Sequence, residues 1–164
     1  MTGNAPFNRS TTKLVLAIHA SARSGLGSSA SINLDGEENT SIVGAPGETV
    51  TLNFRNFVVA DQSSFTLQGT ATTTFIINVT KQFSLSGSSQ IILSGGLQCD
   101  RVFFNVLGRG SVVSLYDNAQ LYGTLTAMQR TVNINGSIVY GAVRARKIFL
   151  TEGARIIPPP VISP

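Results

Sequence analysis

The sequence has few of the residues from which active sites and metal centres are built. Its 164 residues include one histidine, one cysteine and no tryptophan. A single cysteine cannot form an internal disulfide, and one histidine with one cysteine cannot supply the clustered ligands that zinc requires. We therefore expect neither a bound metal nor another cofactor. Cys99 is interpreted as a small buried apolar side chain, because free cysteine is usually buried.

Patterns that present a catalytic group are equally scarce. The chain contains no Gly-x-Ser-x-Gly nucleophile motif. His19 would need a partner such as Ser21 or Asp35, and a structural role for this histidine is the preferred interpretation. The acidic residues do not gather at one repeat position, as a polysaccharide-cleaving enzyme would require. The sequence predicts no catalytic residues and no enzymatic activity.

Charge and long apolar runs are also scarce. Charged residues make up only 12% of the chain, about half of the usual share. No stretch approaches the ~20 apolar residues of a membrane span, and the short apolar run at residues 14–18 is interpreted as a buried strand. A hydrophobic content of 42% is enough for a core. We expect a single domain that does not insert into a membrane.

What the chain does contain is a near-repeat between Phe75 and Leu121. Residues 76–79 align with residues 103–106 at an offset of 27, and residues 83–91 align with residues 113–121 at an offset of 30. Three residues are therefore inserted near position 109. A near-repeat of this length indicates a structural unit that stacks on its own copy.

Alternation of apolar and polar residues runs through the same region and beyond it. This two-residue period is typical of a half-buried strand, and Gly or Asp residues after each short run permit a sharp corner. The pattern predicts an all-β fold, a β-solenoid with little or no helix. One domain is expected over residues 1–157, with an irregular N-terminal coil or cap over 1–48 and regular coils over 49–157. The proline-rich residues 158–164 are interpreted as a linker to a downstream module.

Polar residues at repeat positions suggest two kinds of side-chain row. Asn78 and Asn105 occupy the same place in the two copies, which predicts a hydrogen-bonded asparagine ladder inside the solenoid. Threonine is frequent, and a regular threonine face could order water and bind ice. Thr-x-Thr does not recur at a constant offset, so strand propensity is the preferred explanation. The candidate ligand-binding threonines are Thr66, Thr72, Thr74, Thr124 and Thr126.

Basic residues concentrate in the C-terminal part of the chain, and the net charge is +4. Arg144, Arg146 and Lys147 form the densest group and are candidate contacts for an anionic ligand. Basic side chains also protect strand edges from unwanted pairing, which is the simpler explanation. No aromatic residues alternate with them, so nucleic acid is not an expected partner.

Several segments, taken in their order, resemble the choice-of-anchor A, ice-binding-like adhesive domains. The segments are Phe65–Gly69, Phe75–Val79, Ile92–Gly96, Val102–Val106, Tyr122–Ala127 and Gly141–Ala145. The resemblance covers residues 50–157, about two thirds of the chain. It implies a right-handed parallel β-helix in large exported surface proteins, with a role in adhesion and no established catalytic residues. Related ice-binding proteins lay a long helix along the solenoid, and this chain has no comparable helical stretch.

Together these observations predict a non-catalytic adhesive domain at the cell surface, with its export signal outside this sequence. The expected ligand is a surface polysaccharide or another macromolecule, bound by a flat solenoid face and exposed loops. Two alternatives remain open. The first is ice binding through a threonine-rich face, and the second is a structural fibre subunit whose open ends associate with one another.

Overall fold

A computed structural model of the chain describes residues 30–159, and these residues form an all-β structure. The all-β prediction is confirmed, since a single 3₁₀ turn, η1 (Cys99–Arg101), is the only helical element within residues 30–159. His19, the strand expected at residues 14–18 and residues 160–164 of the expected linker lie outside the described part. The strands are β1 (Ser31–Leu34), β2 (Asn39–Val43), β3 (Thr49–Val59), β4 (Ser64–Gln68), β5 (Thr74–Leu85), β6 (Gln90–Ser94), β7 (Val102–Val106), β8 (Val113–Leu115), β9 (Gln120–Asn135), β10 (Ile138–Thr151) and β11 (Arg155–Ile157).

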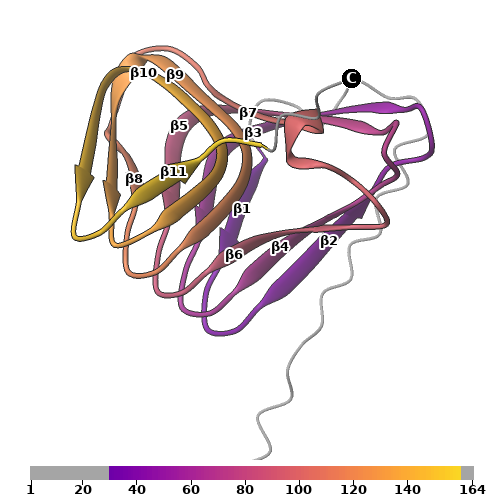
Figure 1. Cartoon of the computed structure of the whole chain (residues 1–164), viewed down its shortest axis with the longest axis horizontal. Coiled ribbons are helices and arrows are strands. Elements are labelled where there is room, and N and C mark those ends of the chain that lie inside the picture. The colour runs from indigo at the N-terminus through magenta and orange to yellow at the C-terminus, as the bar shows by residue number, and fades with distance from the viewer. Residues whose placement is uncertain (1–29, 160–164) are drawn as a thin grey trace, which may run out of the picture.

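Each strand pairs in parallel with a strand one circuit later in the chain. Ser31 of β1 lies beside Asn56 of β3, 25 residues later, and Asn56 lies beside Gln82 of β5. Figure 1 shows these circuits side by side, from indigo at β1 to yellow at β11. We call one circuit a rung. Because neighbouring rungs keep one register, equivalent side chains form continuous rows across them.

Each rung contributes strand segments to three faces, which the chain visits in the order A, B, C. Face A contains β1, residues 56–59, residues 82–85, β8, residues 131–135 and residues 147–151. Face B contains β2, β4, β6, residues 120–122, residues 138–140 and β11. Face C contains residues 49–54, residues 74–79, β7, residues 123–127 and residues 141–145.

The core fills the space between the faces. Apolar residues alternate with polar ones along each strand, so that one row points inward and the next outward. Phe57 and Phe83 are in register on face A, and their rings stack with centroids 5.3 Å apart. Phe65 packs edge-on against Phe57 from face B, at 5.0 Å. All three rings are fully buried. Side chains from successive rungs and from two faces therefore pack into one continuous core.

Paired left-handed residues turn the chain between faces A and B. Gly36 and Glu37, Asp61 and Gln62, Gly87 and Ser88, and Asp117 and Asn118 all have φ between 46° and 69°. Two consecutive residues with positive φ are the signature of a type I′ turn, for which Gly, Asn and Asp are favoured. The turns also bond to one another, since the amide of Gln62 donates to Gly87 O at 2.7 Å. This geometry explains the Gly and Asp residues that follow each short strand.

The rungs become shorter toward the C-terminus, because the corner between faces B and C disappears. Loops at residues 44–48, 69–73 and 95–101 form this corner in the first three rungs. In the next two rungs a single glycine replaces the loop, Gly123 within β9 and Gly141 within β10. Their φ angles are +140° and +152°. The absence of a Cβ at Gly123 and Gly141 permits the backbones of adjacent rungs to touch at this bend.

Regular pairing begins earlier than the sequence indicated. β1 and β2 lie within residues 1–48, where an irregular coil or cap was expected, yet they pair in register with β3 and β4. The cluster of turn residues at 35–38 and 44–47 obscured this pattern. Two short strands between such turns are recognisable only once their partners in the next rung are known.

Candidate functional site

The five candidate threonines do not gather on one surface. Thr74 of β5 and Thr124 and Thr126 of β9 point outward on face C, and all three are half-buried. Thr66 of β4 points outward on face B. Thr72 lies in the corner between faces B and C. The structure therefore divides the set among two faces and a corner.

Thr72 has a structural function in its corner. The amide of Gly47 in the preceding rung donates to Thr72 Oγ1 at 2.9 Å. The hydroxyls of Thr72 and Thr70 lie 3.0 Å apart. The buried Thr73 donates its hydroxyl proton to Ala45 O at 2.9 Å. Much of the threonine cluster is thus used to hold one loop onto the loop of the next rung.

Two outward rows run across the rungs of face C. The first row contains Thr51, Ile76, Phe103, Thr124 and Ala142. The second row contains Asn53, Asn78, Asn105, Thr126 and Arg144. The first row mixes hydroxyl, aliphatic and aromatic side chains, so face C does not present a regular lattice of threonine hydroxyls.

The second row of face C begins with an asparagine ladder. Asn105 Nδ2 donates to Asn78 Oδ1 at 3.1 Å, and Asn78 Nδ2 donates to Asn53 Oδ1 at 2.9 Å. The ladder lies on the outward, half-buried side of the strands, not inside as expected, because each asparagine alternates with buried residues such as Leu52 and Phe54. Asn53 was not included in the predicted ladder, because it precedes the near-repeat that aligned the other two.

Removing the middle amide of the ladder should weaken the fold measurably. In Asn78→Val, Asn105 Nδ2 and Asn53 Oδ1 lose their partners, and we expect a loss of about 1 kcal/mol in the free energy of unfolding. Urea denaturation followed by circular dichroism measures it. The matched control is Asn133→Val, an exposed strand position on face A. Equal losses in the two variants would contradict a stabilising ladder.

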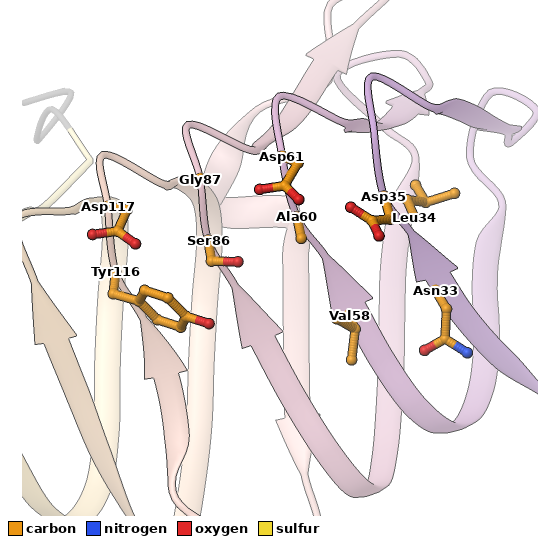
Figure 2. Close-up of a pocket in the computed structure, with 10 residues that line it drawn as sticks. All are labelled: Asn33, Leu34, Asp35, Val58, Ala60, Asp61, Ser86, Gly87, Tyr116 and Asp117. Atoms are coloured by element: carbon orange, nitrogen blue, oxygen red, sulfur yellow. The ribbon is translucent and has the colours of Figure 1, made fainter. Parts of the chain in front are cut away.

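Acidic residues gather at the corner between faces A and B. We call this corner the acidic edge, and it contains six of the eight acidic residues, Asp35, Glu37, Glu38, Asp61, Asp117 and Glu152. Figure 2 shows Asp35, Asp61 and Asp117 on separate turns around a hollow of about 410 Å³. Within residues 30–159, no group of three or more His, Cys, Asp or Glu side chains has an arrangement able to hold a metal ion.

Two carboxyls of the acidic edge, those of Asp35 and Asp61, lie on adjacent turns and interact with each other. A hydrogen bond with Asp35, together with its negative charge, raises the pKa of Asp61 above the usual value of 3.8. A raised pKa in the folded state means that the native protein binds more protons than the unfolded chain, so stability falls as the pH rises through this range. Figure 2 shows the two carboxyl groups turned toward each other across adjacent turns.

The interaction between Asp35 and Asp61 predicts that removing one carboxyl changes the melting temperature in a pH-dependent way. We expect Asp61→Asn to raise the melting temperature at pH 7, because it removes the negative charge of Asp61 that Asp35 repels, and to leave it nearly unchanged at pH 3. Differential scanning calorimetry at the two pH values tests this. Asp117→Asn, on the same edge, is the control. A gain of the same size at both pH values would show that the repulsion between Asp35 and Asp61 is not its source.

Basic residues gather at the corner between faces C and A. We call this corner, together with the first residue of the adjoining face A strand, the basic edge, and it contains Arg55, Lys81, Arg109, Arg130, Arg146 and Lys147. All eight acidic residues of the chain lie elsewhere. Arg146 and Lys147, two of the predicted ligand contacts, are exposed and belong to this edge. Arg144, the third, is exposed beside it and ends the second row of face C.

Arg130 is the one residue of the basic edge that is buried, with 1% of its surface exposed. Its Nε donates to Gly108 O at 3.0 Å, and its Nη2 donates to Leu107 O at 2.7 Å and to Thr80 O at 2.8 Å. Nη1 donates to Lys81 O. Irregular corners free carbonyls from the strand ladder, and one guanidinium satisfies four of them from two earlier corners. No local pattern around Arg130 indicates this role before the fold is known.

Face B carries an aromatic pair near the end of the chain. The rings of Tyr122 and Tyr140 stack with centroids 4.5 Å apart and planes 11° apart. They border a hollow of about 340 Å³, which Cys99 also lines. Burial raises the pKa of the Cys99 thiol, and the neighbouring Asp100 adds to this shift. Cys99 is half-buried, whereas a buried side chain was expected.

The fold and these surfaces define a class, an all-β protein of parallel stacked strands with polar outward rows and two oppositely charged edges. The family model described as "Putative Ice-binding-like adhesive domain" matches residues 1–154. The chain belongs to this family, as the resemblance of its motifs indicated. No curated protein and no solved structure matches it. Among residues 30–159 no helix has the length and apolar character needed to cross a membrane.

Proposed function

We propose that the chain is a right-handed β-solenoid that acts as a non-catalytic adhesive domain at the cell surface. It binds a surface polysaccharide or another macromolecule through face C and the adjoining loops. The observation that carries this proposal is the fixed register of the outward rows, in which each outward position of face C has an equivalent on the next rung and one row keeps a polar side chain on every rung. The adhesive family of the chain supports it.

A surface of this kind suits weak repeated contacts. Neighbouring strands lie roughly 4.8 Å apart, and the asparagine ladder fixes the side chains of three successive rungs. A polymer with its own repeat can then engage several rungs together, and the second contact and later ones are intramolecular. The affinity for a polymer should therefore far exceed the affinity for its single unit.

Binding to immobilised polysaccharides tests the proposal. We expect the double variant Thr124→Glu with Thr126→Glu to bind the best polysaccharide about tenfold more weakly, since it adds bulk and charge to face C. The control, Asn33→Glu with Asn133→Glu, adds the same charge to exposed positions of face A. Equal weakening by the two pairs, or no binding to any polysaccharide or matrix protein, would refute the proposal.

A second candidate function is self-assembly into fibres through the end of the stack. The last rung exposes apolar side chains, with Ile148 39%, Phe149 53% and Leu150 48% accessible. Val132 and Ile134, the equivalents of Ile148 and Leu150 on the preceding rung, are buried. Sedimentation over a concentration series tests this, and a concentration-independent monomer excludes it. Ice binding, the remaining alternative, is tested by thermal hysteresis, which an adhesive domain should not produce.

A further inference from the structure

The strongest unexplained feature of the molecule is the segregation of its charges. Six basic residues share the basic edge, whereas the corner between faces A and B holds six of the eight acidic residues. Neighbouring charges of one sign repel, and a row of them without counter-charges costs stability unless a ligand of opposite charge compensates it. The basic edge is therefore the part of the surface most suited to an anionic partner.

A hollow of about 410 Å³ opens on the basic edge. Three cationic side chains line it, those of Lys81, Arg109 and Arg130. Neutral polar groups also line it, namely the amides of Asn56 and Gln82 and the hydroxyl of Ser111. Asn56 and Gln82 are in register on adjacent rungs, so their amides form a short row parallel to the cations.

Arg130 gives this hollow a permanent positive charge. Its guanidinium is held by four backbone carbonyls, which are neutral, and no acidic residue lies at this corner. A buried charge without a counter-ion projects its field farther than an exposed one, because less water screens it. Lys81 and Arg109 are exposed and can contact a ligand directly, above this fixed charge.

The basic edge also takes a cation from each successive rung. Arg55, Lys81 and Arg109 come from three successive corners, and Arg146 continues the edge at the last corner. Successive strands are roughly 4.8 Å apart. The ladder amides of face C border the row on one side, and Asn56 and Gln82 border it on the other. A linear ligand that follows the edge can therefore meet cations along its length and neutral polar groups on both sides.

We propose that the basic edge binds an acidic polysaccharide, whose carboxylate or sulfate groups contact Lys81 and Arg109 and whose hydroxyls contact the bordering amides. This inference rests on the proposed adhesive function and names its ligand class. The planar fork of an arginine matches the paired oxygens of either anion. No aromatic side chain lines the hollow, so it lacks the stacking surface of a single-stranded nucleic acid site.

The test compares the full chain with two charge-matched double variants. In Lys81→Gln with Arg109→Gln, we expect the dissociation constant for polygalacturonate or dextran sulfate to rise about tenfold, because two direct contacts with the anion are lost. In the control, Arg101→Gln with Arg155→Gln, two exposed cations outside the basic edge are removed, and the change should stay below about twofold. Binding to the two polymers separately identifies carboxylate or sulfate as the preferred group. Binding of the unmodified chain should weaken as sodium chloride rises.

The outcomes separate this inference from the proposed function. Equal losses in both double variants would mean that only net charge matters, and would overturn the inference. Equal or tighter binding to single-stranded DNA would also overturn it. Binding to neutral dextran that both double variants retain would refute the acidic ligand but leave the adhesive function intact. If neither a polysaccharide of any charge nor a matrix protein is bound, the proposed function fails with it. Circular dichroism of both double variants shows that they are folded.

Discussion

Replacing Gly141 with alanine should lower the free energy of unfolding by at least about 3 kcal/mol. Gly141 has φ +152°, and a Cβ there would overlap the carbonyl oxygen of Gly123 on the preceding rung. The backbone of Gly123 is itself confined, since a Cβ on it would lie 2.8 Å from Val102 O. Three rungs are therefore in backbone contact at this bend, and none of them can move without disturbing the strand ladder.

Urea denaturation of Gly141→Ala measures this loss. The control is Gly153→Ala, at a turn with φ +76° and no atom within 4 Å of the added Cβ. Only the backbone strain of a left-handed alanine remains there, about 1 kcal/mol. Similar losses in the two variants would mean that the rungs do not approach so closely at Gly141.

Replacing Arg130 with methionine should cost about 3–5 kcal/mol of stability. Methionine fills part of the volume, but it leaves the carbonyls of Thr80, Lys81, Leu107 and Gly108 without their donor. An unsatisfied buried polar group costs about 1–3 kcal/mol, and water entering the corner would compensate only some of them. The stability of Arg130→Lys should lie between that of Arg130→Met and that of the unchanged protein, because an ammonium cannot reach all four carbonyls in one plane.

Denaturant titrations of Arg130→Met, Arg130→Lys and the exposed control Arg101→Met test this order. The control should change stability by less than about 0.5 kcal/mol. If Arg130→Met were as stable as the unchanged protein, other donors would have to satisfy the four carbonyls. The hydrogen bonds of the guanidinium would then not be what stabilises the two corners at residues 80–81 and 107–108.

The repeat was predictable because hydrophobic residues recur at equivalent positions of its two copies. The alignment of residues 76–79 with 103–106 is confirmed by the pairing of Ile76 with Phe103, and the offset of 30 is confirmed by the pairing of Ser84 with Ser114. Apolar side chains that stack in one core must recur at the same depth in each rung, so a local comparison of two copies finds them.

The corners were less predictable, because their length varies from rung to rung. The corner at the basic edge is one residue long at Arg55 and three residues long at residues 128–130. Basic residues at irregular intervals do not look like a row in the sequence, and only the C-terminal group of Arg144, Arg146 and Lys147 was recognised. Arg130 was not singled out, since burial of an arginine depends on carbonyls 22 to 50 residues away.

Hydrogen bonds between rungs run along the stack, and each strand of residues 30–159 pairs only with adjacent rungs. Force applied at the last rung would thus separate layers one after another, from the end inward, instead of breaking the whole molecule at once. Pulling one copy with an optical trap should give a series of small extensions. A ligand that contacts several rungs would distribute the force among them. A ligand that contacts only the last rung would be released when that rung separates.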